Sequence, residues 1–491
     1  MNPPETESEG MRSKPFWRAI AILTVIADAL TSLPVAAQDA GLGARFDSIF
    51  AQFDNTRSPG CAVGVVQEGE FLFKRGYGMA NLEYGIANSP SSVFRIGSVS
   101  KQFTAAAIVL LAQQGKLSLD DDIREYVPEV PAYERTVTIR HLLHHTSGLR
   151  DYLTLMYLAG QSDDDFYTDD ELVAMLARQQ ELNFPPGDQH LYSNSGYFLL
   201  SQIVRSASGL SLREYAQQHL FGPLGMTHTH FHDDHTHIVS NRASGYAPSG
   251  SSEYRISMTT LGMVGDGGVF TSVEDLLQWE RFFHSDPSAN LPTDRPEHFW
   301  REMLSKGILT NGDTLSYALA LGHGEYRGLP MISHSGGFVG FRAQVVRFPT
   351  ERMSIICLCN VSVANPTRFS QRVADVLLAD RLQPEPERPE RRQPGLEADE
   401  SEPLPLNSQQ KQEFTGSYYS GELDITYEVT IEQGDLVLRV GNDLDGQLRV
   451  SATDQMRRGG VTLRFERGGD GQITGFLLDA GRVKNLQFVK R

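Results

Sequence analysis

The sequence predicts an α+β fold followed by a small antiparallel β-barrel. Strand-like patterns lie at residues 61–75 and again at 315–361, while helix and loop patterns fill the stretch between 120 and 260. Short strands separated by turns recur from 414 to 489, and about six to eight strands in so short a segment are typical of a barrel or sandwich. A chain of 491 residues is long enough for two or three domains.

The first 37 residues are predicted to be a secretory signal peptide. Basic residues precede the apolar run 19–27, and the small residues 35–37 before Gln38 form a cleavage site. Met11 is an alternative start. The apolar run is short for a bilayer core of about 30 Å, which favours cleavage over a membrane anchor. We therefore expect a periplasmic or secreted protein with no stable membrane insertion.

The elements of the first domain follow in order. Residues 44–53 have a helical pattern, and a hairpin turn joins strands 61–66 and 70–75. A long helix is predicted from Ser98 to about Gln114; it is apolar all round and should be buried, and the glycine at 115 should end it. A helix opened by Ser272 follows at 275–283. Strands are predicted at 315–321, 331–333, 340–348 and 353–361, and a last helix at 367–378.

Three cysteines do not make a disulfide framework. Cys357 and Cys359 alternate along one predicted strand and so point to the same face, which indicates two small core residues. Cys61 also lies in an apolar strand. A bridge from Cys61 to one of the others is the alternative in an oxidising compartment.

A segment rich in proline and charge, residues 383–406, separates a first domain (38–382) from the C-terminal domain (407–491). Such a composition cannot bury a core and predicts a semi-extended linker. The C-terminal domain carries no catalytic cluster. Substrate gating, dimerisation and cover for an apolar face all remain open as its role.

The first chemical motif is Ser98-Val99-Ser100-Lys101. Residues three apart on a helix lie about 5–6 Å apart at Cβ, so the serine hydroxyl and the lysine amine are expected side by side. The positive end of the helix dipole favours an alkoxide on the serine. A hydroxyl beside a base is what covalent acyl transfer requires, although most such tetrapeptides are capped helix starts with a solvated lysine.

Two later motifs favour the catalytic interpretation. Tyr192-Ser193-Asn194 and His334-Ser335-Gly336 follow in that order, and with Ser-x-x-Lys they resemble the signature of the serine β-lactamase and penicillin-binding protein superfamily. The resemblance covers roughly residues 46–378 and is nearest to the class C-like branch, which includes D-aminopeptidases, DD-peptidases and esterases. It implies an antiparallel sheet built from both ends of the domain, flanked by helices, with an all-helical insertion. The C-terminal domain resembles the lipocalin-like domains attached to some of these hydrolases.

The resemblance also implies catalytic roles. Ser98 is the nucleophile, and Lys101 and Tyr192 share the removal of its proton. Asn194 holds Lys101 or a substrate amide. Water then hydrolyses the acyl-enzyme with Tyr192 as the base.

The motif His334-Ser335-Gly336 is expected to line the side of the site opposite Ser98 and Lys101. Ser335 and Gly336 bind substrate, and the backbone N–H groups of Ser98 and Gly337 form an oxyanion hole, in which one donor is worth about 3 kcal/mol. His334 is the fourth catalytic side chain and departs from the β-lactamase pattern, which has lysine here. An imidazole is cationic only near or below its ordinary pKa of about 6.5. We expect it to hydrogen-bond the tyrosine of the second motif or a neutral ligand, which favours an amide or ester without a fixed carboxylate.

Charge and histidine content bear on other functions. The formal net charge of −17 argues against a nucleic-acid partner, which needs a basic surface. His141, His144 and His145 have helical spacing, and the histidines between 228 and 237 alternate, so both groups suggest zinc as an alternative. The resemblance instead implies a structural stretch for the first group and a surface loop for the second. The expected hydrolysis needs no metal or other cofactor.

Three functions compete on these observations. The leading one is a secreted serine hydrolase that cleaves peptide-like amides or esters through an acyl-enzyme on Ser98. The first alternative is a β-lactamase or DD-carboxypeptidase that binds penicillin. The second is a binding or sensor protein that keeps the fold without turnover. The expected partner is a small or peptide-like substrate, and the oligomeric state is left open.

Overall fold

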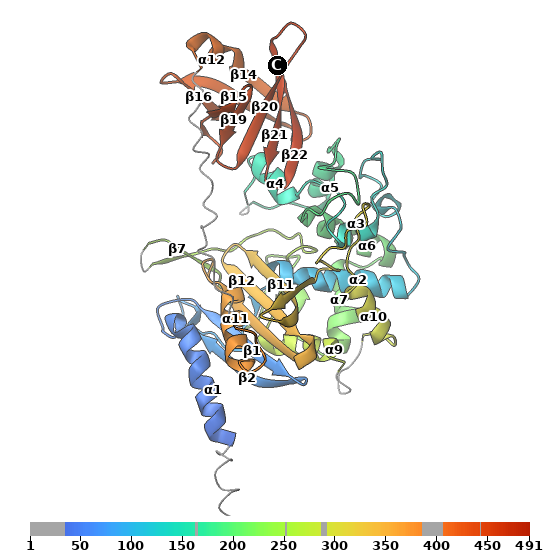
Figure 1. Ribbon diagram of the computed structural model, residues 1–491, viewed down its shortest axis with the longest axis vertical. Coiled ribbons are helices and arrows are strands. Elements are labelled where there is room, and N and C mark those ends of the chain that lie inside the picture. Colours follow the sequence, from blue (N-terminus) through green and yellow to red (C-terminus); the bar gives the residue numbers. More distant parts are fainter. Residues whose placement is uncertain (1–34, 163–164, 251–252, 286–291, 385–405, 442) are drawn as a thin grey trace, which may run out of the picture. The chain divides into compact units, whose positions relative to one another are not determined.

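The computed structural model describes residues 35–162, 165–250, 253–285, 292–384, 406–441 and 443–491 (Figure 1). The chain divides into two compact units, Met1–Ala51 and Gln52–Arg491. In the first unit the structure describes helix α1 (Val35–Phe50), which covers most of the predicted helix at 44–53. Residues 1–34 of the predicted leader (1–37) and residues 385–405 of the predicted linker (383–406) lie outside the described residues. Within the described ranges, no helix has both the length and the apolarity to cross a bilayer.

A six-stranded antiparallel sheet forms the centre of the second unit, in the order β10-β11-β12-β13-β1-β2. Figure 1 shows blue strands from the beginning of the chain beside orange strands from after residue 320, which confirms the sheet built from both ends. β13 is buried at every residue because helices α9 and α11 pack against it. The strand bounds are β1 (Cys61–Gln67), β2 (Glu70–Tyr77), β10 (Gly322–Tyr326), β11 (Leu329–Phe338), β12 (Phe341–Phe348) and β13 (Met353–Cys359).

The predicted strand at 315–321 is wrong. This segment forms no strand, and regular pairing begins only at β10. Its apolar residues Ala318 to Leu321 are nonetheless buried, with Ala320 at a φ of 58°. A short apolar run satisfies a buried irregular segment as well as a buried strand, so its pattern could not separate the two.

Cys61 and Cys359 form a disulfide between β1 and β13, where they are register partners. Of the two alternatives left open by the sequence, the bridge is therefore the one that the structure has. Cys357 remains a free thiol, and burial raises its pKa well above the ordinary range.

The long buried helix begins slightly later than predicted. Residues Gly97–Ser100 form a 3₁₀ turn, η2, and α2 runs from Lys101 to Gln113. Every side chain from Lys101 to Leu111 is buried, and Gly115 ends the helix at a φ of +68°, both as predicted. Helix α6 (Asn194–Ser208) packs against α2 and α3. The other helices are α3 (Ile139–Leu143), α4 (Tyr152–Leu158), α5 (Asp169–Ala177), α7 (Leu212–Ala216), α8 (Gly222–Leu224), α9 (Val273–Phe283), α10 (Pro296–Met303), α11 (Pro366–Leu377) and α12 (Ser408–Phe414).

The C-terminal part is a nearly closed antiparallel barrel of nine strands, in the order β17-β16-β15-β14-β22-β21-β20-β19-β18. Phe465, Phe476 and Phe488 pack together in its core. The sequence predicted about six to eight strands in this segment, and the structure has nine there. Their bounds are β14 (Gly416–Ser420), β15 (Ile425–Glu432), β16 (Asp435–Arg439), β17 (Gly446–Gln447), β18 (Arg449–Ala452), β19 (Gln455–Arg458), β20 (Val461–Arg467), β21 (Ile473–Ala480) and β22 (Val483–Lys490).

Candidate active site

Two glycines bring the serine turn against strand β11. Gly97 has a φ of +51°, and a Cβ on it would lie 2.7 Å from the backbone nitrogen of Gly337. A Cβ on Gly336 would overlap the carbonyl oxygen of Ile96. Only glycine permits both the left-handed backbone and the close approach. As a result, Ser98 and Gly337 line the same cavity, of about 190 Å³.

Lys101 lies beneath that cavity with its side chain completely buried. Its Nζ donates hydrogen bonds to Ser98 Oγ (3.2 Å), Asn194 Oδ1 (2.8 Å) and the backbone oxygen of Asp266 (2.6 Å). Three acceptors match the three N–H bonds of an ammonium group, so the position of Nζ is strongly defined. The predicted hydroxyl, amine and amide therefore form one hydrogen-bonded cluster.

Tyr192 lies beside this cluster between two cations. Lys101 Nζ is 4.8 Å from the centre of its ring, and Cζ of Arg482 is also 4.8 Å from it. Its Oη is buried and has no hydrogen-bond partner among the described residues. Tyr192 lines both the cavity of Ser98 and a neighbouring cavity of about 360 Å³ that holds His334 and Ser335.

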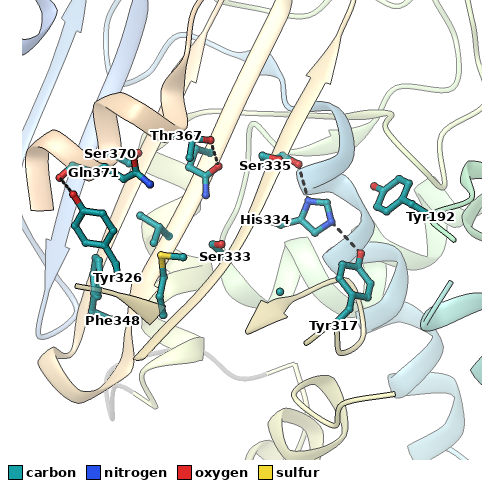
Figure 2. Close-up of a pocket in the computed structure, with 14 residues that line it drawn as sticks. Tyr192, Tyr317, Tyr326, Ser333, His334, Ser335, Phe348, Thr367, Ser370 and Gln371 are labelled. Carbon is teal, nitrogen blue, oxygen red and sulfur yellow. Dashed lines mark hydrogen bonds between the residues drawn. The ribbon is translucent and has the colours of Figure 1, made fainter. Parts of the chain in front are cut away.

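A chain of neutral groups runs beside Tyr192 (Figure 2). His334 Nδ1 lies 2.6 Å from the backbone oxygen of Ser335, and its Nε2 lies 3.0 Å from Tyr317 Oη. Tyr317 Oη also lies 3.3 Å from His145 Nε2, and His145 Nδ1 accepts from the backbone N–H of Ser193. Since a carbonyl can only accept, His334 donates from Nδ1, so Tyr317 donates to its Nε2 and His145 donates to Tyr317.

The ionisation of these groups agrees with that assignment. Burial, and then the charge of Lys101, lowers the pKa of His334 to about 4. Burial and the same lysine hold the pKa of His145 well below its ordinary value, and burial raises that of Tyr317 well above 10. All three side chains are neutral at pH 7. The expected bond from His334 to Tyr192 is replaced by one to Tyr317.

Two acidic residues, Asp266 and Asp151, lie at or near the Ser98 cavity, and Asp266 lines it. Asp266 carries a buried carboxyl group, to which Tyr152 Oη donates at 3.2 Å, and burial raises the pKa of that group. Asp151 Oδ2 accepts from the backbone N–H of Asn194 at 2.8 Å, at the first residue of α6. This bond orients the amide that holds Lys101.

The barrel contributes one residue to the cavity. Arg482 lies in the turn between β21 and β22 and lines the cavity together with Ser98, Asn194 and Gly337. The sequence analysis found no catalytic cluster in the C-terminal domain and did not single out this arginine. No local motif marks it, because Ser98, Asn194 and Gly337 lie between 145 and 384 residues earlier in the chain.

Most of the predicted site residues thus line two adjoining cavities, whereas the buried Lys101 and Gly336, which packs against Ile96, line neither. Residues of the first two motifs and Gly337 surround the smaller cavity, whereas His334 and Ser335 line the larger one, with Tyr192 shared. No sequence motif indicated four further residues of the two cavities, Tyr317, Tyr152, Asp266 and Arg482. For His145 the sequence suggested only a zinc ligand or a residue of a structural stretch.

The two histidine groups do not converge. In the first, His141 caps α3 by accepting from the backbone N–H of Thr138, while His145 turns into the site at a φ of 56°. In the second, His230 and His232 are in contact at 3.1 Å. Across the described ranges, the one group of three or more potential ligands with converging atoms is Cys61, Cys357 and Cys359, of which two are disulfide-bonded.

Comparison with known proteins places this geometry in context. A family model described as Beta-lactamase matches residues 46–380. A D-aminopeptidase of Gluconobacter oxydans is 29% identical over 319 residues, which are 65% of this chain and 59% of that protein, so the match spans less than two thirds of its length. Penicillin-binding protein 4* of Bacillus subtilis is 27% identical over 437 residues, 85% of this chain and 92% of that protein.

A solved structure also matches both the sheet and the barrel. It is an octameric penicillin-binding protein homologue from Pyrococcus abyssi, with a TM-score of 0.59. The match covers 92% of this chain and 99% of that one at 22% sequence identity. At this identity the likeness concerns the fold.

Proposed function

Since this chain belongs to the beta-lactamase family of serine hydrolases, we propose that it cleaves peptide-like amides or esters through an acyl-enzyme on Ser98. The observation that supports this most directly is the cluster around Lys101, whose Nζ contacts Ser98 Oγ at 3.2 Å and Asn194 Oδ1 at 2.8 Å. Covalent catalysis requires a nucleophile, a base within hydrogen-bond reach and a third group that orients the base. In this proposal residues 38–382 are the hydrolase domain.

Acylation begins at the serine. Lys101 must first release to solvent one of the three ammonium protons that its Nζ donates in the structure. Ser98 Oγ then bonds to the substrate carbonyl carbon while its proton passes to the lone pair of Nζ. We propose Lys101 as the first base because its Nζ contacts the serine hydroxyl, whereas the ring of Tyr192 lies beside Lys101. The electron pair of the carbonyl moves onto its oxygen, where the backbone N–H groups of Ser98 and Gly337 stabilise the negative charge.

Tyr192 then connects the base with the leaving group. As the carbon–nitrogen or carbon–oxygen bond breaks, the leaving group takes a proton through Tyr192 Oη, and the proton held by Lys101 replaces it. An unpartnered phenol beside the lysine suits this transfer, because substrate can supply its missing hydrogen-bond partner. Water next attacks the acyl ester, and its proton returns by way of Tyr192 to Ser98 Oγ as the ester bond breaks.

We propose D-aminoacyl amides and short esters as the substrate class. The D-aminopeptidase relative supports D-stereochemistry. With its pKa near 4, His334 is neutral at pH 7 and cannot act as the strand lysine of a β-lactamase does, which argues against β-lactams as preferred substrates. The predicted leader supports action outside the cytoplasm, in the periplasm or the medium.

A substrate panel with mass detection of the acylated serine tests the proposal. The mature protein is offered D-alanine amide, L-alanine amide, p-nitrophenyl acetate and a chromogenic cephalosporin, with and without EDTA. We expect turnover of the D-amide and the ester in both conditions, and an acyl mass increase on Ser98 that decays within minutes. A stable protein that takes no label from a fluorophosphonate would contradict hydrolysis and favour a binding protein.

A further inference from the structure

The histidine-rich segment 228–237 has no role in the proposed hydrolysis. Strand β6 (His230–Phe231) places its first residue and His232 two positions apart, and therefore on one face. Further along, the backbone N–H of His237 donates to the backbone oxygen of Asp234 at 3.1 Å. This turn returns the chain, so the imidazole rings of His230, His232 and His237 gather beside one another.

The three rings have separations close to those around a single metal ion. The ring centre of His230 lies 5.4 Å from that of His232 and 5.5 Å from that of His237, and the third separation is 6.3 Å. Three imidazoles bound to a tetrahedral zinc ion have ring centres about 5.2 Å apart. His230 Nε2 and His232 Nδ1 are also 3.1 Å apart, and two nitrogen ligands of such an ion are separated by about 3.3 Å.

One ring must move before the three nitrogens can meet. Among the residues that the structure describes, only the three cysteines have potential ligand atoms that already lie within 4.8 Å of one another, so the ring of His237 must turn. Its side chain is exposed, and exposed side chains change rotamer within nanoseconds. His232 is 5% exposed and His230 is half-buried, which fixes these two rings. Two fixed ligands and one exposed ligand let an ion enter from solvent.

The two fixed rings can both offer a lone pair. Burial above all lowers the pKa of His230 to about 4 and that of His232 to about 3, so both are neutral at pH 7. In the contact between them, one ring donates and the other accepts. A metal ion needs a lone pair from each, so the donating ring moves its proton to its other nitrogen.

The charges near the cluster restrict which cation can bind. Arg95, Arg213 and Arg242 act on His232 and oppose a positive ion. Asp233 offsets one of these charges, because its Oδ1 lies 2.7 Å from Arg213 Nη1. Ca²⁺ and Mg²⁺ prefer oxygen ligands, whereas zinc binds neutral imidazole. The cluster therefore suits a transition-metal ion and not an alkaline-earth ion.

We propose that His230, His232 and His237 bind one zinc ion, with a water molecule as the fourth ligand. A cavity of about 590 Å³, which His230 and His237 line, has room for that water. The two other histidines of the segment have different neighbours. His228 Nδ1 lies 3.6 Å from Asp275 Oδ1, and the ring of His235 packs on that of Phe166.

The zinc site stabilises the fold and goes beyond the proposed function. β6 pairs with β9 (Val269–Thr271), which follows Asp266 in the chain. The backbone oxygen of Asp266 accepts from Lys101 Nζ. Zinc therefore fastens the histidine segment to the small sheet that continues from the support of Lys101, and it touches none of the reacting groups.

Zinc titration of the full chain after EDTA treatment and dialysis tests the proposal. Calorimetry should give one zinc ion per chain, and the melting temperature should rise by about 3 °C at a zinc concentration about a hundred times Kd. Cobalt(II) bound in place of zinc should give the strong visible absorption of a tetrahedral site. Ca²⁺ should produce neither effect.

Two variants of the same exposed loop locate the site. H237Q removes a ligand on the surface, so it should fold normally and bind zinc at least about tenfold more weakly. H235Q is the matched control and should keep the wild-type affinity, because its ring contacts Phe166. H230Q should weaken binding as H237Q does.

The outcomes separate this proposal from the hydrolase proposal. Unchanged zinc affinity in H237Q, or an equal loss in H235Q, would contradict the zinc site, as would a wild-type protein that binds no zinc. Protein that hydrolyses the substrate panel and binds no zinc refutes this proposal alone. Protein that binds zinc through His237 and hydrolyses nothing refutes only the proposed function.

Discussion

Arg150 and Glu422 form an ion pair between the hydrolase domain and the barrel, with Nη1 and Oε1 2.6 Å apart. The Arg150 side chain is completely buried and that of Glu422 is 9% exposed. Arg150 also bonds Gln179 and the backbone at the beginning of β22, directly after Arg482, so a single side chain connects the loop before α4 with two segments of the barrel. The position of Arg482 in the cavity therefore depends on this pair.

Replacing the acid of this pair should destabilise the protein. In E422Q the guanidinium of Arg150 stays buried without its counter-ion, which typically costs about 3–5 kcal/mol. Urea unfolding measures the loss. The control is E432Q, at an exposed pair with Arg439, which should cost less than about 1 kcal/mol. Equal losses in the two variants would mean that the buried pair has no special role.

The nucleophile prediction uses two serines of one turn. S98A should abolish fluorophosphonate labelling and lower kcat by at least about 10⁴-fold, because no other hydroxyl can form the acyl ester. Ser100 Oγ accepts from the backbone N–H of Val269 and faces away from the chemistry, so S100A should keep the label and lose about 1 kcal/mol of stability. Intact-mass spectrometry reads both results. Labelled S98A would assign the nucleophile elsewhere.

The neutral chain beside Tyr192 is tested at its middle member. Y317F removes the hydroxyl between His145 and His334 and leaves two buried nitrogens unbonded, at a cost of about 1–3 kcal/mol. We expect lower thermal stability and a decrease in kcat, since His334 loses its orientation. The matched variant Y326F removes a hydroxyl bonded to Asp375 at the outer end of the same cavity. It should affect kcat much less, and a similar decrease in both would show that the effect is not specific to the chain.

His334 makes the stability depend on pH in a defined direction. Its pKa is about 4 in the folded protein, below the ordinary value of 6.5, so the unfolded chain binds this proton more readily. The contribution is fully present above pH 6.5 and is lost as the pH falls from 6.5 toward 4. Urea unfolding between pH 7.5 and 4.5 should show a loss about 2 kcal/mol smaller in H334Q than in wild-type protein. Parallel curves would refute a buried neutral His334.

Local sequence was sufficient for several elements of the fold. The apolar run after Ser98 predicted a buried helix because an all-round apolar surface has no other stable place, and Gly115 ended it as a left-handed residue should. The hairpin of β1 and β2 was predicted from the turn residues between the two strands, which are also a local signal. The strand predicted at 315–321 was wrong because burial there is achieved without pairing, and that irregular segment is what places Tyr317 beside His334.

The sequence by itself determined the hydrolase signature, because Ser98 and Lys101 are three residues apart and helical geometry alone makes them neighbours. It also determined the strand-rich character of the barrel, because the alternation of apolar and polar residues along a strand is a local pattern. Only the tertiary structure decided that His334 is paired with Tyr317 and uncharged, and that Arg482 of the barrel lines the cavity of Ser98. Burial and tertiary contacts set those properties, the first between residues 17 positions apart and the second between residues far apart in the chain, and no local pattern encodes them.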